Sequence, residues 1–219
     1  MTVSRGRPSS SARLAPATTT AGIGRQLAEA GVVEDQRTFR VALWRSGRDR
    51  LLQAGEYRFT ESASALDVID VLARGQVHLR TVTFPEGLTR WEMAEVFGRS
   101  EFGVAEEFLA ASERADLVED LDPDATDLEG YLFPETYALP RGATADDLVE
   151  AMLAQFRRTF DDALLAQAAE QEMTVRQVVT LASLIQRETG RDDERPIVSA
   201  VYTNRLDRRM PLQCDPTVI

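Results

Sequence analysis

The sequence predicts an α+β protein, with a small mixed unit over residues 20–83 and a larger, helix-rich unit over residues 84–219. Two kinds of pattern indicate this fold class. Apolar residues recur at helical spacing in several segments. Residues 76–84 instead alternate apolar or β-branched side chains with polar ones, as a half-buried strand does. Residues 1–19 are rich in Ser, Thr, Ala, Arg and Pro, so we expect a disordered tail there.

The small unit is expected to contain three helices and two strands. A first helix begins at Thr20 and ends before Gly31, because Ile23 and Leu27 share one apolar face. The remaining elements follow from the same kind of spacing and from glycine stops. They are a helix over 36–44, a turn and strand over 51–59, a helix over 62–73 and the strand over 76–84.

The larger unit is expected to be mainly helical. Residues 112–127 are acidic and rich in turn formers, and they lack the ligand spacing of a calcium loop, so we predict a solvated loop. Residues 128–137 follow as an extended segment. The predicted helices cover 90–97, 143–160, 161–171 and 173–190, and a last one opens at 192–196.

Composition excludes several classes of chemistry. The net charge of the 219 residues is -11, which argues against nucleic acid as a partner. The chain has no lysine, which excludes a pyridoxal-phosphate Schiff base and a Gly-Lys-Ser/Thr phosphate loop. The single Cys214 cannot form an internal disulfide or a Cys-rich zinc site, and nothing near the single His78 marks a nucleophile. Carboxylate chemistry remains, without metal or cofactor.

Glu188 is the strongest candidate for that chemistry. Thr174 and Gln177 form a capping box that starts a helix, and a helical wheel then centres Glu188 on an apolar stripe. We therefore expect a carboxyl group on a buried face, where loss of water favours the protonated form that a general acid needs. A structural salt bridge to Arg195 or Arg205 explains the same placement equally well.

Two further segments could hold a sugar. In LEGYLFPETY (128–137), Tyr131, Phe133 and Tyr137 alternate along the chain with carboxylates close by, which is typical of a sugar groove and also of a core strand. The second segment is RRMPLQCDPTVI (208–219), whose polar residues could line a sugar site or serve only as turn residues.

Three strings resemble the MltG/YceG-like family of endolytic murein lytic transglycosylases in order and spacing. They are LEGYLFPETY, LASLIQRET (181–189) and ERPIVSAVYTNRLDRRMPLQCDPTVI (194–219), and the resemblance covers about Thr18 to Ile219. It implies a LysM-like unit followed by a catalytic unit, in an enzyme anchored in the bacterial inner membrane and facing the cell wall. It also implies that the glutamate of the E-T pair, here Glu188, is catalytic; Gln186 stands where many relatives carry a second glutamate.

The implied reaction is cleavage of nascent glycan strands between N-acetylmuramic acid and N-acetylglucosamine, leaving 1,6-anhydro ends. Glu188 would protonate the glycosidic oxygen and then take the proton of the C6 hydroxyl, so a second catalytic carboxylate is not required. The partners implied are peptidoglycan strands, with cell-wall synthases as further candidates. The candidates for holding substrate are Glu129, Tyr131, Glu135, Asn204, Gln213 and Asp215.

Other hypotheses remain open. The protein could bind peptidoglycan through the LysM-like unit without cleaving it, or recruit cell-wall synthases as a scaffold. A lyase of the aminodeoxychorismate type is excluded by the missing lysine. The family has a membrane helix and a strand before residue 20 and continues past residue 219, so we expect this chain to represent part of a full-length enzyme, with the tail in place of that strand.

Overall fold

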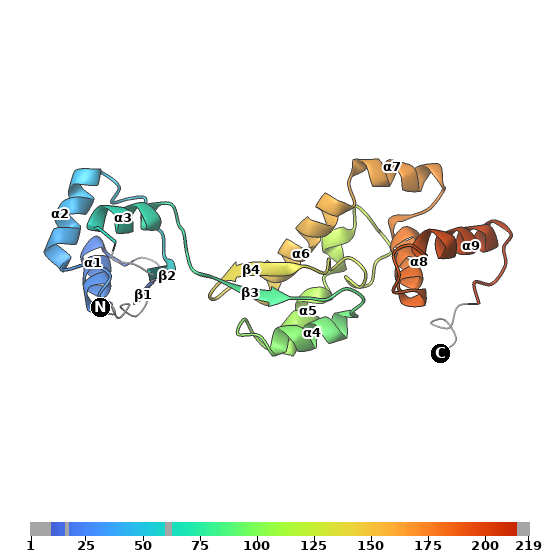
Figure 1. Ribbon diagram of the computed structural model, residues 1–219, viewed down its shortest axis with the longest axis horizontal. Coiled ribbons are helices and arrows are strands. Elements are labelled where there is room, and N and C mark those ends of the chain that lie inside the picture. Colours follow the sequence, from blue (N-terminus) through green and yellow to red (C-terminus); the bar gives the residue numbers. More distant parts are fainter. Residues whose placement is uncertain (1–9, 16–17, 60–62, 214–219) are drawn as a thin grey trace, which may run out of the picture. The chain divides into compact units, whose positions relative to one another are not determined.

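The computed structural model describes residues 10–15, 18–59 and 63–213, and it confirms a mixed α+β architecture (Figure 1). The chain divides into two units, each with its own internal contacts. Unit 1 contains the chain up to residue 81 together with 138–142, and unit 2 contains residues 82–137 and 143 onward. The predicted boundary lay between residues 83 and 84, and the observed division lies two residues earlier. In addition, residues 138–142 belong to unit 1, which the sequence pattern did not indicate.

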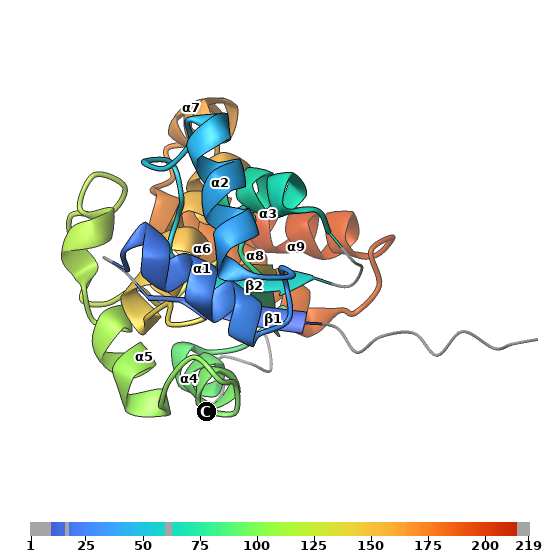
Figure 2. The ribbon, with the colours of Figure 1, turned by 90° about the vertical axis from the view of Figure 1, so that its left-hand side faces the viewer.

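Unit 1 packs three helices on a two-stranded sheet (Figure 2). Strands β1 and β2 run antiparallel, with Ala12 opposite Tyr57. Both residues are buried against Leu27, Phe39 and Leu72 of the helices. The elements are β1 (Ser10–Leu14), α1 (Thr20–Glu29), α2 (Gln36–Ser46), β2 (Gly55–Phe59) and α3 (Ala65–Ala73).

The expectation of a disordered tail over 1–19 is wrong for Ser10–Leu14. Ala12 and Leu14 are only 3% and 2% exposed, and the strand pairs along its whole length with β2. The small and polar residues of this segment are typical of a disordered tail. The segment is a strand because it pairs with β2, which lies more than forty residues away in the sequence. A strand therefore does precede Thr20 in this chain.

Local capping explains where the helices of unit 1 begin and end. The Asp35 carboxylate accepts hydrogen bonds from the backbone N–H of Arg37 and Thr38 and starts α2. Gly47 ends the same helix in the left-handed region, at φ 66°, which a residue with a Cβ would adopt only under strain. The three predicted helices, which begin at Thr20 or cover 36–44 and 62–73, are thus confirmed, and their observed ends differ from the predicted ends by at most three residues.

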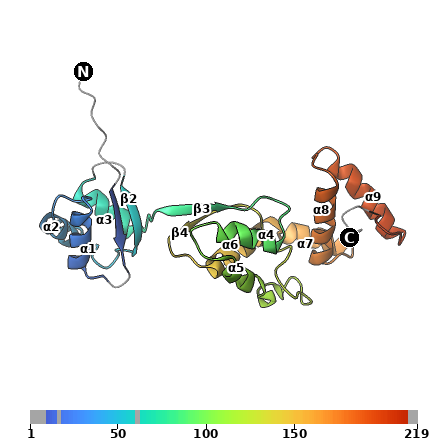
Figure 3. The same ribbon diagram turned by 90° about the horizontal axis from the view of Figure 1, so that it is seen from below.

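Unit 2 is mainly helical, as expected (Figure 3). Strands β3 (Leu79–Thr83) and β4 (Thr136–Pro140) form a second two-stranded sheet, and only residues 82–83 and 136–137 of these strands belong to unit 2. The hydroxyls of Thr83 and Thr136 hydrogen-bond at 2.8 Å. The helices are α4 (Arg90–Gly98), α5 (Ala105–Ser112), the 3-10 helix η1 (Ala115–Val118), α6 (Ala145–Thr159), α7 (Asp162–Glu170), α8 (Val175–Glu188) and α9 (Arg195–Asp207).

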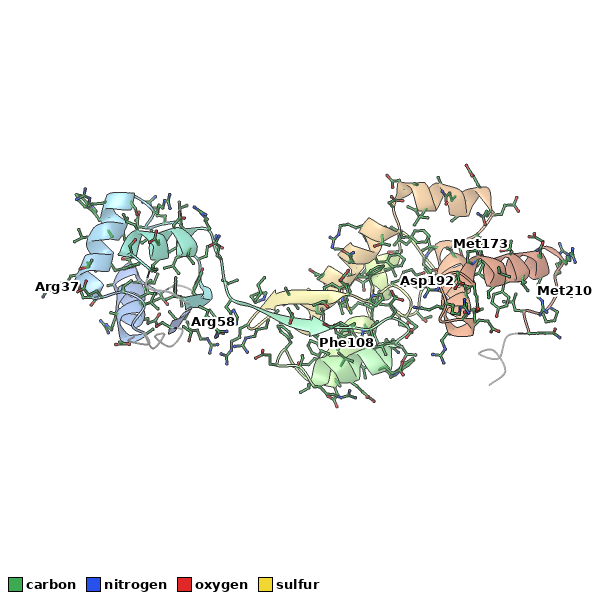
Figure 4. All side chains as sticks on the ribbon, in the orientation of Figure 1. Arg37, Arg58, Phe108, Met173, Asp192 and Met210 are labelled. Atoms are coloured by element: carbon green, nitrogen blue, oxygen red, sulfur yellow. The ribbon has the colours of Figure 1, made fainter. Side chains whose placement is uncertain are left out.

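An aromatic cluster forms the core where β3, α4 and α5 meet. Phe108 is fully buried, with its ring centroid 6.0 Å from that of Phe84 and 5.6 Å from that of Phe97 (Figure 4). Tyr137 of β4 packs edge-on against Phe84 at 6.2 Å. Rings at these distances gain attraction beyond that of area burial alone.

The acidic segment 112–127 is not simply a solvated loop. Asp122 is 7% exposed, and one of its oxygens accepts hydrogen bonds from the Tyr131 hydroxyl at 2.5 Å and from Arg176 Nε at 2.6 Å. Burial raises the pKa of Asp122, but the hydrogen bonds and the charge of Arg176 outweigh it, so the pKa lies below its usual value. Val118 of η1 is also fully buried.

Asp122 should make the stability of unit 2 depend on pH. Because its pKa is lower in the folded state, its stabilising contribution is full above about pH 4 and is lost as the pH falls. We expect Asp122→Asn to lower the unfolding free energy at neutral pH by about 2 kcal/mol. Urea unfolding from pH 7 to pH 3 should show a shallower acid decline in the variant, and equal declines would contradict the assignment.

Candidate active site

Glu188 is the last residue of α8, and its side chain is exposed. The expectation that it sits on a buried face is therefore wrong. Leu181, Leu184 and Ile185 do form a stripe, but they are only half-buried, and Val175 is the buried residue among those described in α8. The helices that pack most on α8 are α7 and α9, and they leave the end of the stripe open to solvent.

Tyr202 holds the Glu188 carboxylate. Its hydroxyl donates a hydrogen bond to Glu188 Oε2 at 3.0 Å, and Tyr202 itself is 5% exposed. The two arginines of the salt-bridge hypothesis are engaged elsewhere, since Arg195 pairs with Asp192 at 3.2 Å and Arg205 donates to the Leu212 carbonyl. Within the described residues, Glu188 thus has a neutral hydroxyl partner and no ion pair.

A short loop brings Tyr202 back to Glu188. Thr189 adopts extended backbone angles, φ -140° and ψ 131°, and ends α8 one residue before the predicted stop at Gly190. Its hydroxyl donates to Glu194 Oε2 at 2.8 Å and accepts from the Arg191 N–H at 3.1 Å. These bonds fix the turn into α9, which carries Tyr202; Figures 1 and 3 show the two helices meeting at this turn.

The end of α8 also lies beside the segment 86–92. Gln186 Nε2 donates to Glu86 Oε2 at 2.7 Å. Hydrogen bonds from Thr89 lower the pKa of Glu92, and the positive charge of Arg187 contributes to the same shift. Residues 85–89 (PEGLT) and the start of α4 are therefore neighbours of the Glu188 helix.

Glu129 joins the LEGYLF motif to this region. Its Oε2 accepts the backbone N–H of Arg90 at 2.8 Å, at the N-terminus of α4. Gly130 has φ 85°, and a Cβ there would lie 3.2 Å from Val179 of α8, so the motif passes close to that helix. Between them lies a cavity of about 370 Å³, lined by Thr126, Asp127, Glu129, Gly130, Tyr131, Arg176, Val179, Thr180 and Ser183.

The other predicted substrate residues have different surroundings. The Tyr131 ring packs against Phe156 at 5.3 Å, and with its hydroxyl on Asp122 it has the contacts of a core residue. Glu135 is exposed and directly precedes β4. Asn204 is exposed on α9. Gln213 is exposed too, and its Oε1 lies 3.4 Å from Arg205 Nη1. Asp215 lies outside the described residues.

Tyr202 is the site residue that sequence reasoning missed. It stands fourteen residues after Glu188, on the next helix, so a wheel of one helix could not reveal the contact. Within residues 10–15, 18–59 and 63–213, no three His, Cys, Asp or Glu side chains form a cluster that could hold a metal ion. In that same part of the chain no helix is long and apolar enough to span a membrane.

Comparison with known proteins identifies the family. A sequence profile described as the YceG-like family matches residues 13–219. The chain belongs to the YceG-like family. This confirms the resemblance drawn from the three strings and extends it to β1, because the match begins within that strand.

Two curated relatives in this family are named "Endolytic murein transglycosylase". One, from Streptococcus pneumoniae serotype 2 (strain D39 / NCTC 7466), is 30% identical over 224 residues, covering 90% of this chain and 40% of the relative. The other, from Bacillus subtilis (strain 168), is 37% identical over 93 residues, covering 42% of this chain and 26% of the relative. The chain thus spans less than half the length of these relatives.

A solved structure shows the same fold. The crystal structure of a putative yceG-like protein from Listeria monocytogenes matches with a TM-score of 0.56 at 20% identity, covering 96% of this chain and 74% of that chain. At this identity the match shows the fold alone, and it extends over nearly the whole of this chain.

Proposed function

We propose that this protein is an endolytic murein lytic transglycosylase in which Glu188 transfers the proton. The observation that carries the proposal is the environment of Glu188: an exposed carboxylate at the end of α8, held on one oxygen by the Tyr202 hydroxyl and without an ion pair in the described residues. The names of the curated relatives support the reaction class.

The chemistry requires one group that gives and then takes a proton. In its protonated form Glu188 donates to the glycosidic oxygen between N-acetylmuramic acid and N-acetylglucosamine, and that bond breaks. Its carboxylate then accepts the proton of the muramic C6 hydroxyl, whose oxygen closes on C1 to form the 1,6-anhydro ring. Because no water attacks, one acid–base residue suffices, unlike the carboxylate pair of hydrolases. Tyr202 occupies Oε2 and leaves Oε1 for the substrate.

The remaining assignments follow from this proposal. Unit 1 serves as a LysM-like peptidoglycan-binding unit and unit 2 as the catalytic unit, in an enzyme at the inner membrane that faces the cell wall. Glycan strands lie along the end of α8, and the residues offered for holding them are Glu129, Tyr131, Glu135, Asn204, Gln213 and Asp215. Of these, Glu129 lines the cavity beside α8 and also holds the start of α4. Cell-wall synthases are further candidate partners.

Product chemistry tests the reaction class. Purified peptidoglycan digested with this protein should release fragments that end in 1,6-anhydro-muramic acid, which are lighter by one water than hydrolysis products in mass spectrometry. Reducing ends instead would make the enzyme a hydrolase and would require a second carboxylate such as Glu129 or Glu135. Binding to peptidoglycan without any cleavage would favour the non-enzymatic hypothesis.

Tyr202→Phe should slow turnover without weakening substrate binding. The variant keeps the buried ring but loses the hydrogen bond to Glu188 Oε2, so the carboxylate is less well oriented. Because the Glu188 carboxylate is exposed, water can replace the lost hydroxyl as its hydrogen-bond donor, so we expect kcat to fall by about tenfold with KM nearly unchanged. Thr203→Ala, an exposed change next in sequence, is the control. A change in KM alone would mean that Tyr202 binds substrate instead.

A further inference from the structure

The outer face of α2 carries arginine and apolar side chains side by side. Arg37, Arg40, Val41 and Trp44 follow the i, i+3, i+4, i+7 spacing that places residues on one side of a helix. Phe39 and Leu43 lie on the opposite side, in the core of unit 1. Trp44 is 82% exposed and Val41 58% exposed, which is unusual for side chains of this size. We call the residues Arg37, Arg40, Val41, Trp44 and Arg45 the α2 face.

The arginines of the α2 face form no salt bridge in the described residues, although the charge of Arg37 contributes to lowering the pKa of Asp35 at the start of the helix. Within the part of the chain that the structure describes, none of Arg37, Arg40 and Arg45 lies within salt-bridge distance of an acidic side chain. By contrast, the exposed Arg74 and Arg99 each pair with an acidic residue one helical turn away. Residues 36–46 contain no Asp or Glu at all. Figure 4 shows Arg37 pointing outward from unit 1.

The charge of unit 1 agrees with this local pattern. Unit 1 carries 13 arginines against 8 acidic residues, a net charge of +5, whereas unit 2 carries 12 arginines against 28 acidic residues, a net charge of -16. The acidic character of the chain therefore belongs to unit 2 alone. A basic unit within an acidic protein predicts an anionic surface as the partner of that unit.

The chemistry of the α2 face favours a lipid surface over a sugar. Sugars bind in concave sites with convergent hydrogen-bonding groups, whereas this is the convex side of a helix whose middle is aliphatic and aromatic. Tryptophan prefers the boundary between water and lipid, and arginines reach from the helix toward phosphate groups while their stems stay in apolar surroundings.

We propose that unit 1 docks through the α2 face onto an anionic phospholipid bilayer. Trp44 and Val41 enter the headgroup boundary, and the arginines bind lipid phosphates. This contact lies in unit 1, which contains none of the residues assigned to catalysis, and it does not depend on the proposed glycan cleavage.

Vesicle sedimentation tests the contact. The protein should bind vesicles of phosphatidylcholine with roughly one-third phosphatidylglycerol, bind pure phosphatidylcholine much less, and dissociate as salt is added. Arg37→Gln with Arg40→Gln should weaken binding about 30-fold, at about fivefold per arginine. Arg74→Gln with Arg99→Gln removes the same charge from paired positions and should have little effect. In a Trp91→Phe background, the emission of Trp44 should shift to the blue on binding.

Several outcomes would overturn the proposal. These are no binding of the wild type to anionic vesicles at low salt, equal loss of binding in both double variants, or an unshifted Trp44 spectrum. If Arg37→Gln with Arg40→Gln loses binding to peptidoglycan sacculi but keeps vesicle binding, the face recognises the cell wall instead. If sedimentation velocity shows a dimer that Trp44→Gln converts to a monomer, the α2 face binds a second copy of this chain instead. Thermal melts of each variant establish that unit 1 is folded.

Discussion

Glu188→Gln should abolish the release of 1,6-anhydro products from peptidoglycan. Glutamine has nearly the same shape, and its carbonyl oxygen can still accept the hydrogen bond from Tyr202, so the end of α8 should keep its structure. It cannot give or take the proton. Because one residue serves as both acid and base in the proposed reaction, we expect kcat to fall by about a thousandfold or more while substrate binding persists.

A matched variant separates this effect from a general change of charge. Glu170 is an exposed glutamate at the end of α7, and Glu170→Gln should leave kcat within about twofold of the wild type. Sedimentation with sacculi should show equal binding for both variants. Substantial activity in Glu188→Gln would remove Glu188 from the mechanism and direct attention to Glu86, which lies beside the same helix end.

Phe108→Ala should be the most damaging core substitution in unit 2. The side chain is fully buried and contacts Phe84 and Phe97, so truncation leaves a cavity as well as losing ring contacts. Phenylalanine-to-alanine changes in such positions cost about 3–5 kcal/mol, which is a large part of the stability of a domain of this size. We therefore expect unit 2 to be partly or wholly unfolded at 37 °C.

The two tryptophans allow this loss to be assigned to one unit. Trp44 lies in unit 1 and Trp91 in unit 2, so Trp44→Phe leaves a reporter in unit 2 alone. Denaturant unfolding followed by Trp91 fluorescence should show the midpoint shift for Phe108→Ala. Val104→Ala, at a position 54% exposed just before α5, should change the unfolding free energy by less than about 0.5 kcal/mol. Equal shifts for both variants would show that Phe108 is not part of the core.

Local sequence signals predicted much of the secondary structure correctly. Thr174 with Gln177 and Pro196 mark the start of the last two helices, and these signals act over one helical turn. The absence of lysine restricted the chemistry in the same direct way. Such features depend on neighbours in the chain, so the sequence alone determines them.

The substrate-binding residues were harder to predict, because each polar side chain has more than one satisfactory environment. Tyr131 and Glu129 stand two residues apart, yet one packs in the core with its hydroxyl on Asp122 and the other caps α4 at the surface. Alternation along an extended segment separates two faces but does not say which face meets a sugar. Their roles in substrate binding stay a prediction.

By itself, the sequence determined the family, the α+β class and the main helices with their caps, whereas the assignment of Glu188 to proton transfer stays a prediction. The tertiary structure alone decided that Ser10–Leu14 is a strand, that Asp122 is buried, and that Glu188 is exposed with Tyr202 on its carboxylate. The physical reason is the range of the interactions. A cap forms within one turn of helix, whereas a strand partner, an ion pair on a buried carboxylate and a hydroxyl on the next helix exist only once distant segments have been brought together by packing.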